Sequence, residues 1–154
     1  MITKKKKFIS EKQAITEAVK ARKQGKKIVT TNGVFDIVHV GHIRNLSKAK
    51  KLGDILIVGI NSDASVKANK GPLRPIIPEK ERGEMLAALE VIVFVFIFKE
   101  RTPLVWIEKI KPHIHVKGGG RDILMHPDFL NQKMLLDKIG TKFVLVQHVD
   151  GKST

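Results

Sequence analysis

The 154 residues can form one domain around a single hydrophobic core and are too few for two independent domains. Lys and Arg number 29 against 15 Asp and Glu, and the net charge of +14 favours anionic partners without distinguishing nucleotides, phosphosugars and nucleic acid. The chain has no cysteine, which excludes disulfides, thiolate zinc sites and thiol redox catalysis, and we therefore expect it in the cytoplasm.

The N-terminal segment is basic, but charged residues from Glu11 onwards stand where a signal peptide has its apolar stretch, so we do not expect secretion. Residues 11–24 predict an amphipathic helix with Ile15, Ala18 and Val19 on one face, ended by Gly25. We expect residues 1–24 to form a leader and residues 26–154 to form the catalytic core of one domain.

Apolar runs of strand length alternate with amphipathic segments along the rest of the chain. Strands are predicted at 27–31, 55–60, 91–98, 113–116 and 142–146, and helices at 42–53, 79–89, 102–110 and 127–139. A short helix or loop at 63–69 leads into a proline-rich loop at 71–78. The run 91–98 is read as a buried strand, because a membrane-spanning helix needs roughly 20 apolar residues.

This alternation predicts an α/β fold: a Rossmann-like, doubly wound sheet of five parallel strands with helices on both faces. Ligands of such sheets bind beyond the carboxyl ends of the strands. We therefore look for the functional residues in the loops that follow the predicted strands.

The run TNGVFDIVHVGH, residues 31–42, lies where the first of these strands leads into a helix. His39 and His42 are three residues apart and can face the same way at the helix N-terminus, where free N–H groups and the helix dipole favour a phosphate. Gly41 keeps the backbone open between the two rings, and Gly33 is expected to allow a tight turn. A two-histidine metal site is the competing interpretation, but no HExxH pattern or third ligand accompanies the pair, so we expect no metal bound by side chains.

Four ordered segments resemble the heptose 1-phosphate adenylyltransferases of the cytidylyltransferase-like superfamily, whose motif is HxGH. They are TNGVFDIVHVGH, LIVGINSD (56–63), KGPLRPIIPEKERGEMLAALE (70–90) and VKGG (116–119). The resemblance covers about residues 25–154. It implies that a phosphate oxygen of one substrate attacks the α-phosphorus of ATP or CTP and that pyrophosphate leaves, with no covalent enzyme intermediate.

The resemblance also implies roles for individual residues. The catalytic residues would be His39 and His42, which donate to the reacting phosphate, and Lys70, which closes on the triphosphate. The nucleotide-binding residues would be Asn32, Gly33, Val34, Phe35, Asp36, Gly41, Lys117, Gly118, Gly119, Ser153 and Thr154. The substrate-binding residues would be Asn61, Asp63, Arg74 and Arg82.

Within the nucleotide-binding set, Asp36 is expected to brace its loop, and the backbone of residues 117–119 is expected to lie against the nucleobase. The segment VDGKST (149–154) resembles the start of the family's last motif, and a helix normally follows it, so we expect either that the C-terminal helix is missing from this sequence or that the end of the chain is disordered. Three positions depart from the family's pattern: Gly120 and Val93 stand where Asp is usual, and Val34 stands where Cys is common.

The function expected from the resemblance is transfer of AMP from ATP to D-glycero-manno-heptose 1-phosphate, with Mg²⁺ accompanying ATP. A glycerol-3-phosphate-type cytidylyltransferase and an FAD-forming adenylyltransferase are the alternatives within the enzyme class. A basic nucleic-acid-binding module is the alternative outside it. No segment resembles the sugar kinase fused to some members, so we expect a stand-alone transferase, acting as a homodimer, with ATP and a sugar phosphate as partners and neither membrane nor nucleic acid.

Overall fold

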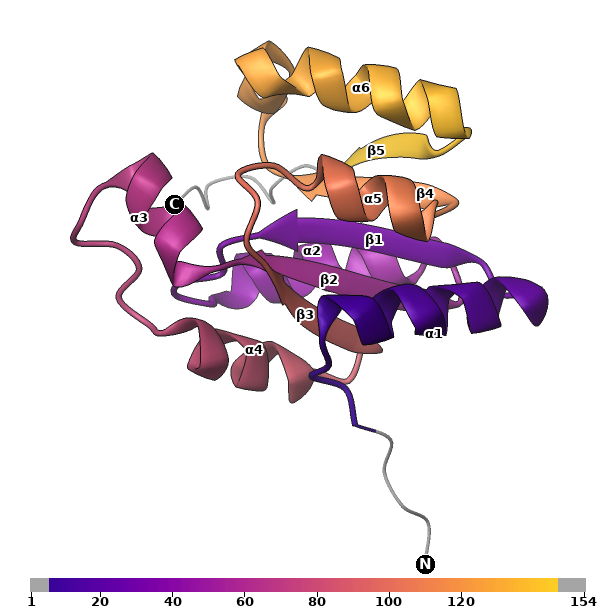
Figure 1. Ribbon diagram of the computed structural model, residues 1–154, viewed down its shortest axis with the longest axis horizontal. Coiled ribbons are helices and arrows are strands. Elements are labelled where there is room, and N and C mark those ends of the chain that lie inside the picture. The colour runs from indigo at the N-terminus through magenta and orange to yellow at the C-terminus, as the bar shows by residue number, and fades with distance from the viewer. Residues whose placement is uncertain (1–5, 147–154) are drawn as a thin grey trace, which may run out of the picture.

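The computed structural model describes residues 6–146. Its centre is a sheet of five parallel strands in the order β3-β2-β1-β4-β5 (Figure 1). The strands are β1 (Ile28–Gly33), β2 (Ile55–Asn61), β3 (Phe94–Phe98), β4 (Ile114–Gly118) and β5 (Lys142–Val146). The prediction of a doubly wound, parallel α/β sheet is confirmed.

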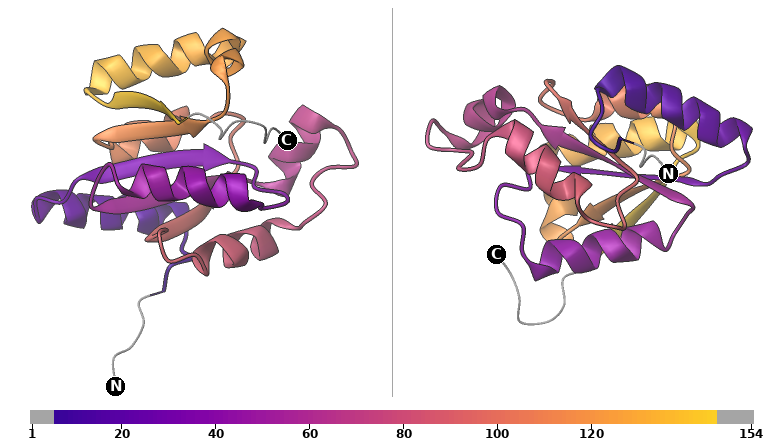
Figure 2. Two further views of the ribbon diagram at one scale, coloured as in Figure 1. Left: turned by 180° about the vertical axis from the view of Figure 1, so that it is seen from behind. Right: turned by 90° about the horizontal axis from the view of Figure 1, so that it is seen from below.

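The helices cover both faces of this sheet. They are α1 (Glu11–Lys23), α2 (Val40–Lys50), α3 (Asp63–Lys70), α4 (Glu79–Ala87), α5 (Leu104–Ile110) and α6 (Pro127–Ile139), with a 3₁₀ turn, η1 (Arg121–Met125). Helices α1, α5 and α6 bury Ala14, Ala18, Trp106 and Leu136 against one face. Figure 2 shows α2 across the opposite face, which α4 also covers.

The strand β3 is shorter than predicted. The run 91–98 is apolar throughout, but residues 91–93 form the turn that joins α4 to the strand, and β3 begins at Phe94. Ile92 is nevertheless fully buried, so the run belongs to the core as expected. An apolar run alone does not separate strand residues from buried turn residues.

The topology fixes where a ligand can bind. From β1 the chain passes to β2 on one side, and the other neighbour of β1 is β4. A crevice forms where the order of a parallel sheet reverses in this way, at the carboxyl ends of the strands. Here that point lies between the ends of β1 and β4, next to the start of α2.

Candidate active site

The two histidines of residues 31–42 lie side by side at the N-terminus of α2. His39 is the N-cap, and its ring centroid is 4.1 Å from that of His42. The Nδ1 atom of His39 accepts from the Gly41 amide at 3.0 Å, and the Nδ1 atom of His42 accepts from the His39 amide at 3.2 Å. These two bonds satisfy backbone donors that a helix start leaves unpaired.

The same bonds determine where each neutral imidazole carries its hydrogen. A ring nitrogen that accepts an N–H bond cannot itself be protonated, so the hydrogen is on Nε2 in both rings. The Nε2 atom of His39 is buried and has no hydrogen-bond partner among the described residues. The backbone therefore sets the orientation of both rings before any ligand binds, and His42 lines two of the three cavities described below, whereas His39 lines none of them.

Gly41 makes room for this arrangement. A Cβ atom built on Gly41 would lie 2.8 Å from Cε1 and 3.0 Å from Nδ1 of the His39 ring, well inside normal contact distance. The glycine therefore keeps the backbone open for the histidine ring, as the sequence suggested.

We predict that Gly41→Ala displaces the His39 ring and lowers kcat about 10²-fold or more, because a shift of about 1 Å in a catalytic group can cost that much. Steady-state kinetics checks this, with the thermal midpoint measured alongside. Ser47→Ala, farther along the same helix, is the control. A Gly41→Ala enzyme with wild-type kcat would show that the position of His39 does not matter.

The tight turn of the motif is made by Phe35 and not by Gly33. Phe35 has φ +52°, in the left-handed region, whereas Gly33 is the last residue of β1. Gly33 is required for a different reason, since a Cβ on it would lie 3.0 Å from the Phe35 ring. The strained turn places that ring 5.6 Å from the His42 ring, centroid to centroid.

Asp36 fastens the proline-rich loop to the motif. Its carboxylate accepts from the amides of Ile76, at 2.9 and 3.0 Å, and Ile77, at 2.8 Å, and it lies 3.5 Å from the Arg74 guanidinium. Desolvation would raise the pKa of Asp36, but these hydrogen bonds and the charge of Arg74 together hold it below its ordinary value. Asp36 thus braces the proline-rich loop, and its carboxylate also keeps the half-exposed Arg74 beside the motif.

Arg82 lies in the interior, away from any position where it could meet a substrate. Its side chain has no exposed surface. Its guanidinium donates to the carbonyls of Ile77, Val34 and Asn61 at 2.8–2.9 Å and to the Asp63 carboxylate at 2.7 Å. This geometry corrects the sequence interpretation of Arg82 as a ligand of the acceptor phosphate: four of its five N–H groups already hold the motif loop, the end of β2 and the start of α3 together.

Asn61 and Asp63 were also candidates for substrate binding. Asn61 lines a cavity, described below, and its amide contacts Ser65 at 3.4 Å. The Asp63 carboxylate is the partner of Arg82, and the Asp63 amide donates to Glu79 at 2.9 Å. Asp63 therefore anchors α3, and Asn61 is the one of the two that faces an open space.

Three adjoining cavities open at the carboxyl edge of the sheet. The inner cavity, about 200 Å³, is lined by residues 31–35, His42, Asn45 and residues 116–118, among others. The large cavity, about 570 Å³, lies between α3 and the η1–α6 segment, and the outer cavity, about 440 Å³, lies beside Asp36 and Arg74. Val34 lines all three, so they meet at the motif.

The two lysines of the predicted site face this junction. Lys70, at the end of α3, lines the large and outer cavities. Lys117 lines the inner and large cavities, and its ammonium donates to the Asn32 carbonyl at 3.3 Å. Gly118 and Gly119 follow in the chain, and a Cβ on Gly118 would lie 2.7 Å from the Asn45 amide nitrogen. The structure thus brings residues 32–36, His42, Lys70, Arg74 and residues 117–118 to one edge, whereas Ser153 and Thr154 lie outside the described residues.

Sequence reasoning assigned no role to His115, which proves to be part of this site. Its buried ring lies 2.8 Å from the Thr30 hydroxyl through Nδ1 and 3.1 Å from Asn32 Oδ1 through Nε2. Burial, and after it the charge of Lys117, lower the pKa of His115 to about 3, so the ring is neutral. The signal available in the sequence was a polar residue at a core position of an apolar strand, which indicates a buried hydrogen-bond network.

Within residues 6–146, no three Asp, Glu, His or Cys side chains gather as metal ligands would. The carboxylates nearest the histidines are already engaged, Asp36 with backbone amides and Asp63 with Arg82. None of the helices in this part of the chain combines the length and apolarity needed to cross a membrane.

A model of the cytidylyltransferase-like family matches residues 30–147. The Bifunctional protein HldE of Trichlorobacter lovleyi is 46% identical over 147 residues, and that of Geobacter metallireducens is 51% identical over 140 residues. These alignments cover 95% and 91% of this chain but only 29% and 27% of the relatives, so the chain spans less than a third of their length. The solved lipopolysaccharide core biosynthesis protein from Thermoplasma volcanium is 29% identical, with a TM-score of 0.67 over 83% of this chain and 100% of that one.

Proposed function

This chain belongs to the cytidylyltransferase-like family, and from that premise we propose that it transfers AMP from ATP to D-glycero-manno-heptose 1-phosphate, giving ADP-heptose and pyrophosphate. The names of the relatives support this choice of acceptor: HldE proteins are about 46–51% identical, and the Thermoplasma volcanium protein is named for lipopolysaccharide core biosynthesis. The observation that carries the proposal is the pair of backbone-fixed histidines at the N-terminus of α2.

The reaction forms one bond and breaks one. An oxygen of the acceptor's phosphate attacks the α-phosphorus of ATP, the bond from that phosphorus to the bridging oxygen breaks, and pyrophosphate leaves with the electron pair. Catalysis of such a transfer consists of positioning the groups and stabilising the charge on the phosphoryl oxygens. The Nε2–H groups of His39 and His42 supply two donors for this purpose, and the N-terminus of α2 adds its positive dipole.

Positive charge above the reacting phosphorus comes from Lys70, which reaches the junction of the cavities from α3. The Mg²⁺ that accompanies ATP would be coordinated by the triphosphate, since the nearby carboxylates are engaged elsewhere. We further propose that the enzyme acts in the cytoplasm and as a homodimer.

A pyrophosphate-release assay tests the reaction. The full chain is incubated with ATP or CTP together with heptose 1-phosphate, glycerol 3-phosphate or FMN. We expect release only with ATP and the heptose phosphate. Release with CTP and glycerol 3-phosphate, or with ATP and FMN, would assign one of the alternative reactions instead. No release with any pair, together with salt-sensitive RNA or DNA binding, would favour the nucleic-acid-binding module.

A further inference from the structure

Within residues 6–146, the Lys117 ammonium is a part-buried cation without an anionic partner. It lies in the wall shared by the inner and large cavities, and its hydrogen bond goes to the neutral Asn32 carbonyl. No described carboxylate pairs with it. A cation partly withdrawn from water is stabilised by an anion beside it, so this position favours a ligand that supplies negative charge.

The surroundings of Lys117 keep its side chain in place. His115, two residues earlier on the same strand, fixes the Asn32 side chain through Oδ1, and Asn32 in turn offers its carbonyl to Lys117. The Asn32 amide NH₂ is left to face the cavities, because its oxygen is taken by His115. Lys117 and Asn32 thus present an ammonium and an amide donor at the same place.

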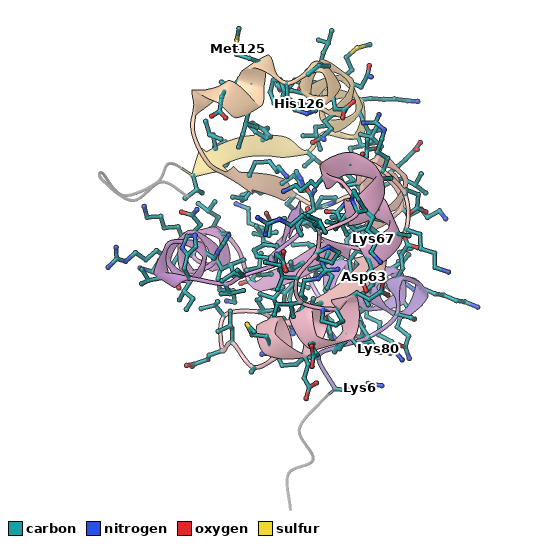
Figure 3. All side chains as sticks on the ribbon, turned by 90° about the vertical axis from the view of Figure 1, so that its left-hand side faces the viewer. Lys6, Asp63, Lys67, Lys80, Met125 and His126 are labelled. Carbon is teal, nitrogen blue, oxygen red and sulfur yellow. The ribbon has the colours of Figure 1, made fainter. Side chains whose placement is uncertain are left out.

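The large cavity has two chemically different ends. Lys117 and Lys70 lie at the end next to the motif, and the η1–α6 side carries Asp122, His126, Gln132 and Asp128, whose carboxylate is paired with Arg101. Figure 3 views the molecule from this edge, with His126 on the η1–α6 side and Asp63 and Lys67 on the α3 side. Carboxylates and amides suit sugar hydroxyls, and ammonium groups suit a phosphate, so the cavity matches a polyhydroxylated phosphate ester lying along it.

We propose that the Lys117 side chain binds the phosphate of the acceptor, and that the acceptor's sugar extends from there into the large cavity. This inference rests on the proposed function for the identity of the acceptor. It assigns the smaller inner cavity to the nucleotide, and it gives Lys117 a side-chain role beyond the backbone contact that the family resemblance implied.

Burial, and after it the positive charge of Lys70, lower the pKa of Lys117 to about 8. The ammonium is therefore mostly charged at about pH 7, half charged near pH 8 and mostly neutral at about pH 9. The other titratable groups around the large cavity are Lys70 from α3, Arg101 before α5, and Asp122, His126 and Asp128. Arg101 and Asp128 are paired with each other at 2.6 Å, and His115 behind Lys117 stays neutral. We therefore expect the affinity for the acceptor to fall above about pH 8, because Lys117 loses its positive charge there.

Calorimetric titration of the full chain tests the proposal. Heptose 1-phosphate, mannose 1-phosphate, orthophosphate and a non-hydrolysable ATP analogue are titrated separately into wild type, Lys117→Met, Lys117→Arg and Lys67→Met. Lys67 is an exposed lysine of α3 and serves as the matched charge control. We expect Lys117→Met to weaken sugar-phosphate binding at least about tenfold and to leave the ATP analogue within about twofold. Lys117→Arg should retain most of the affinity, and Lys67→Met should match wild type.

The pH dependence of wild type gives a second readout that needs no variant to fold. Sugar-phosphate affinity should fall between about pH 7 and pH 9, a range in which the phosphate itself, with a second pKa of about 6, stays dianionic. The same curve for Lys117→Arg should be flat, because arginine keeps its charge.

Three outcomes would overturn the proposal. Lys117→Met could bind the sugar phosphate as wild type does, it could lose the ATP analogue to the same extent, or wild type could bind none of heptose 1-phosphate, mannose 1-phosphate and orthophosphate. If wild type binds mannose 1-phosphate or orthophosphate through Lys117 but does not bind heptose 1-phosphate, the proposed acceptor is wrong and the role of Lys117 stands.

Discussion

Replacing His42 by alanine is expected to lower kcat about 10²–10³-fold, because removing one preorganised donor from a developing phosphoryl charge costs roughly 2.7–4 kcal/mol. The loss should fall on kcat, since the donor acts most strongly in the transition state. Steady-state pyrophosphate release with ATP and heptose 1-phosphate measures it. Wild-type turnover by His42→Ala would remove the histidine from the mechanism.

Two further variants distinguish the roles of the two ring nitrogens of His42. Asparagine can place an oxygen where Nδ1 accepts from the His39 amide, at 3.2 Å, but has no group at the position of Nε2. Glutamine can place an amide donor near the position of Nε2. If donation to the phosphate is what matters, His42→Gln retains more activity than His42→Asn. The reverse order would mean that the bond to the backbone is the important one.

Arg82→Met is expected to lower the free energy of unfolding by about 3–5 kcal/mol, the usual cost of removing one partner from a buried ion pair. Asp63 is 31% exposed, which places the value toward the lower end, while the carbonyls of Val34, Asn61 and Ile77 also lose their donor. Urea denaturation at neutral pH measures the change. Lys80→Met, an exposed lysine of the same helix, is the control.

The same variant separates a structural role of Arg82 from binding of substrate. With Arg82 gone, the motif loop, the end of β2 and the start of α3 are no longer held together, so kcat should fall along with stability. A fully stable Arg82→Met enzyme that has lost only its affinity for the acceptor would restore the substrate-binding role and contradict the buried geometry.

Much of the fold could be predicted because the apolar pattern in this chain is strong. Helix α6 and strand β5 have the predicted bounds, and the parallel direction of the strands follows from the alternation of strands and helices. Rules based on local sequence failed where contacts between distant segments determine the backbone conformation. Phe35 adopts a left-handed backbone because its ring packs at the site. Residue propensities would instead assign the left-handed position to Gly33, two residues earlier.

The candidate site was predictable in place but not in detail. The paired histidines, Lys117 at the end of a strand and Lys70 before the proline-rich loop could be identified from their positions in the chain. The burial of Arg82 could not, because four acceptors from three separate segments meet only after folding. The contact of His115 with Asn32 likewise depends on the pairing of β1 with β4, which brings residues 83 positions apart into hydrogen-bond distance.

In the proposed mechanism, the Nε2–H groups of His39 and His42 hold the α-phosphate. A crystal structure of the full chain with a non-hydrolysable ATP analogue tests it most directly. We predict α-phosphate oxygens about 2.7–3.2 Å from both Nε2 atoms, at the N-terminus of α2. A well-ordered nucleotide whose α-phosphate contacts neither ring would contradict the account.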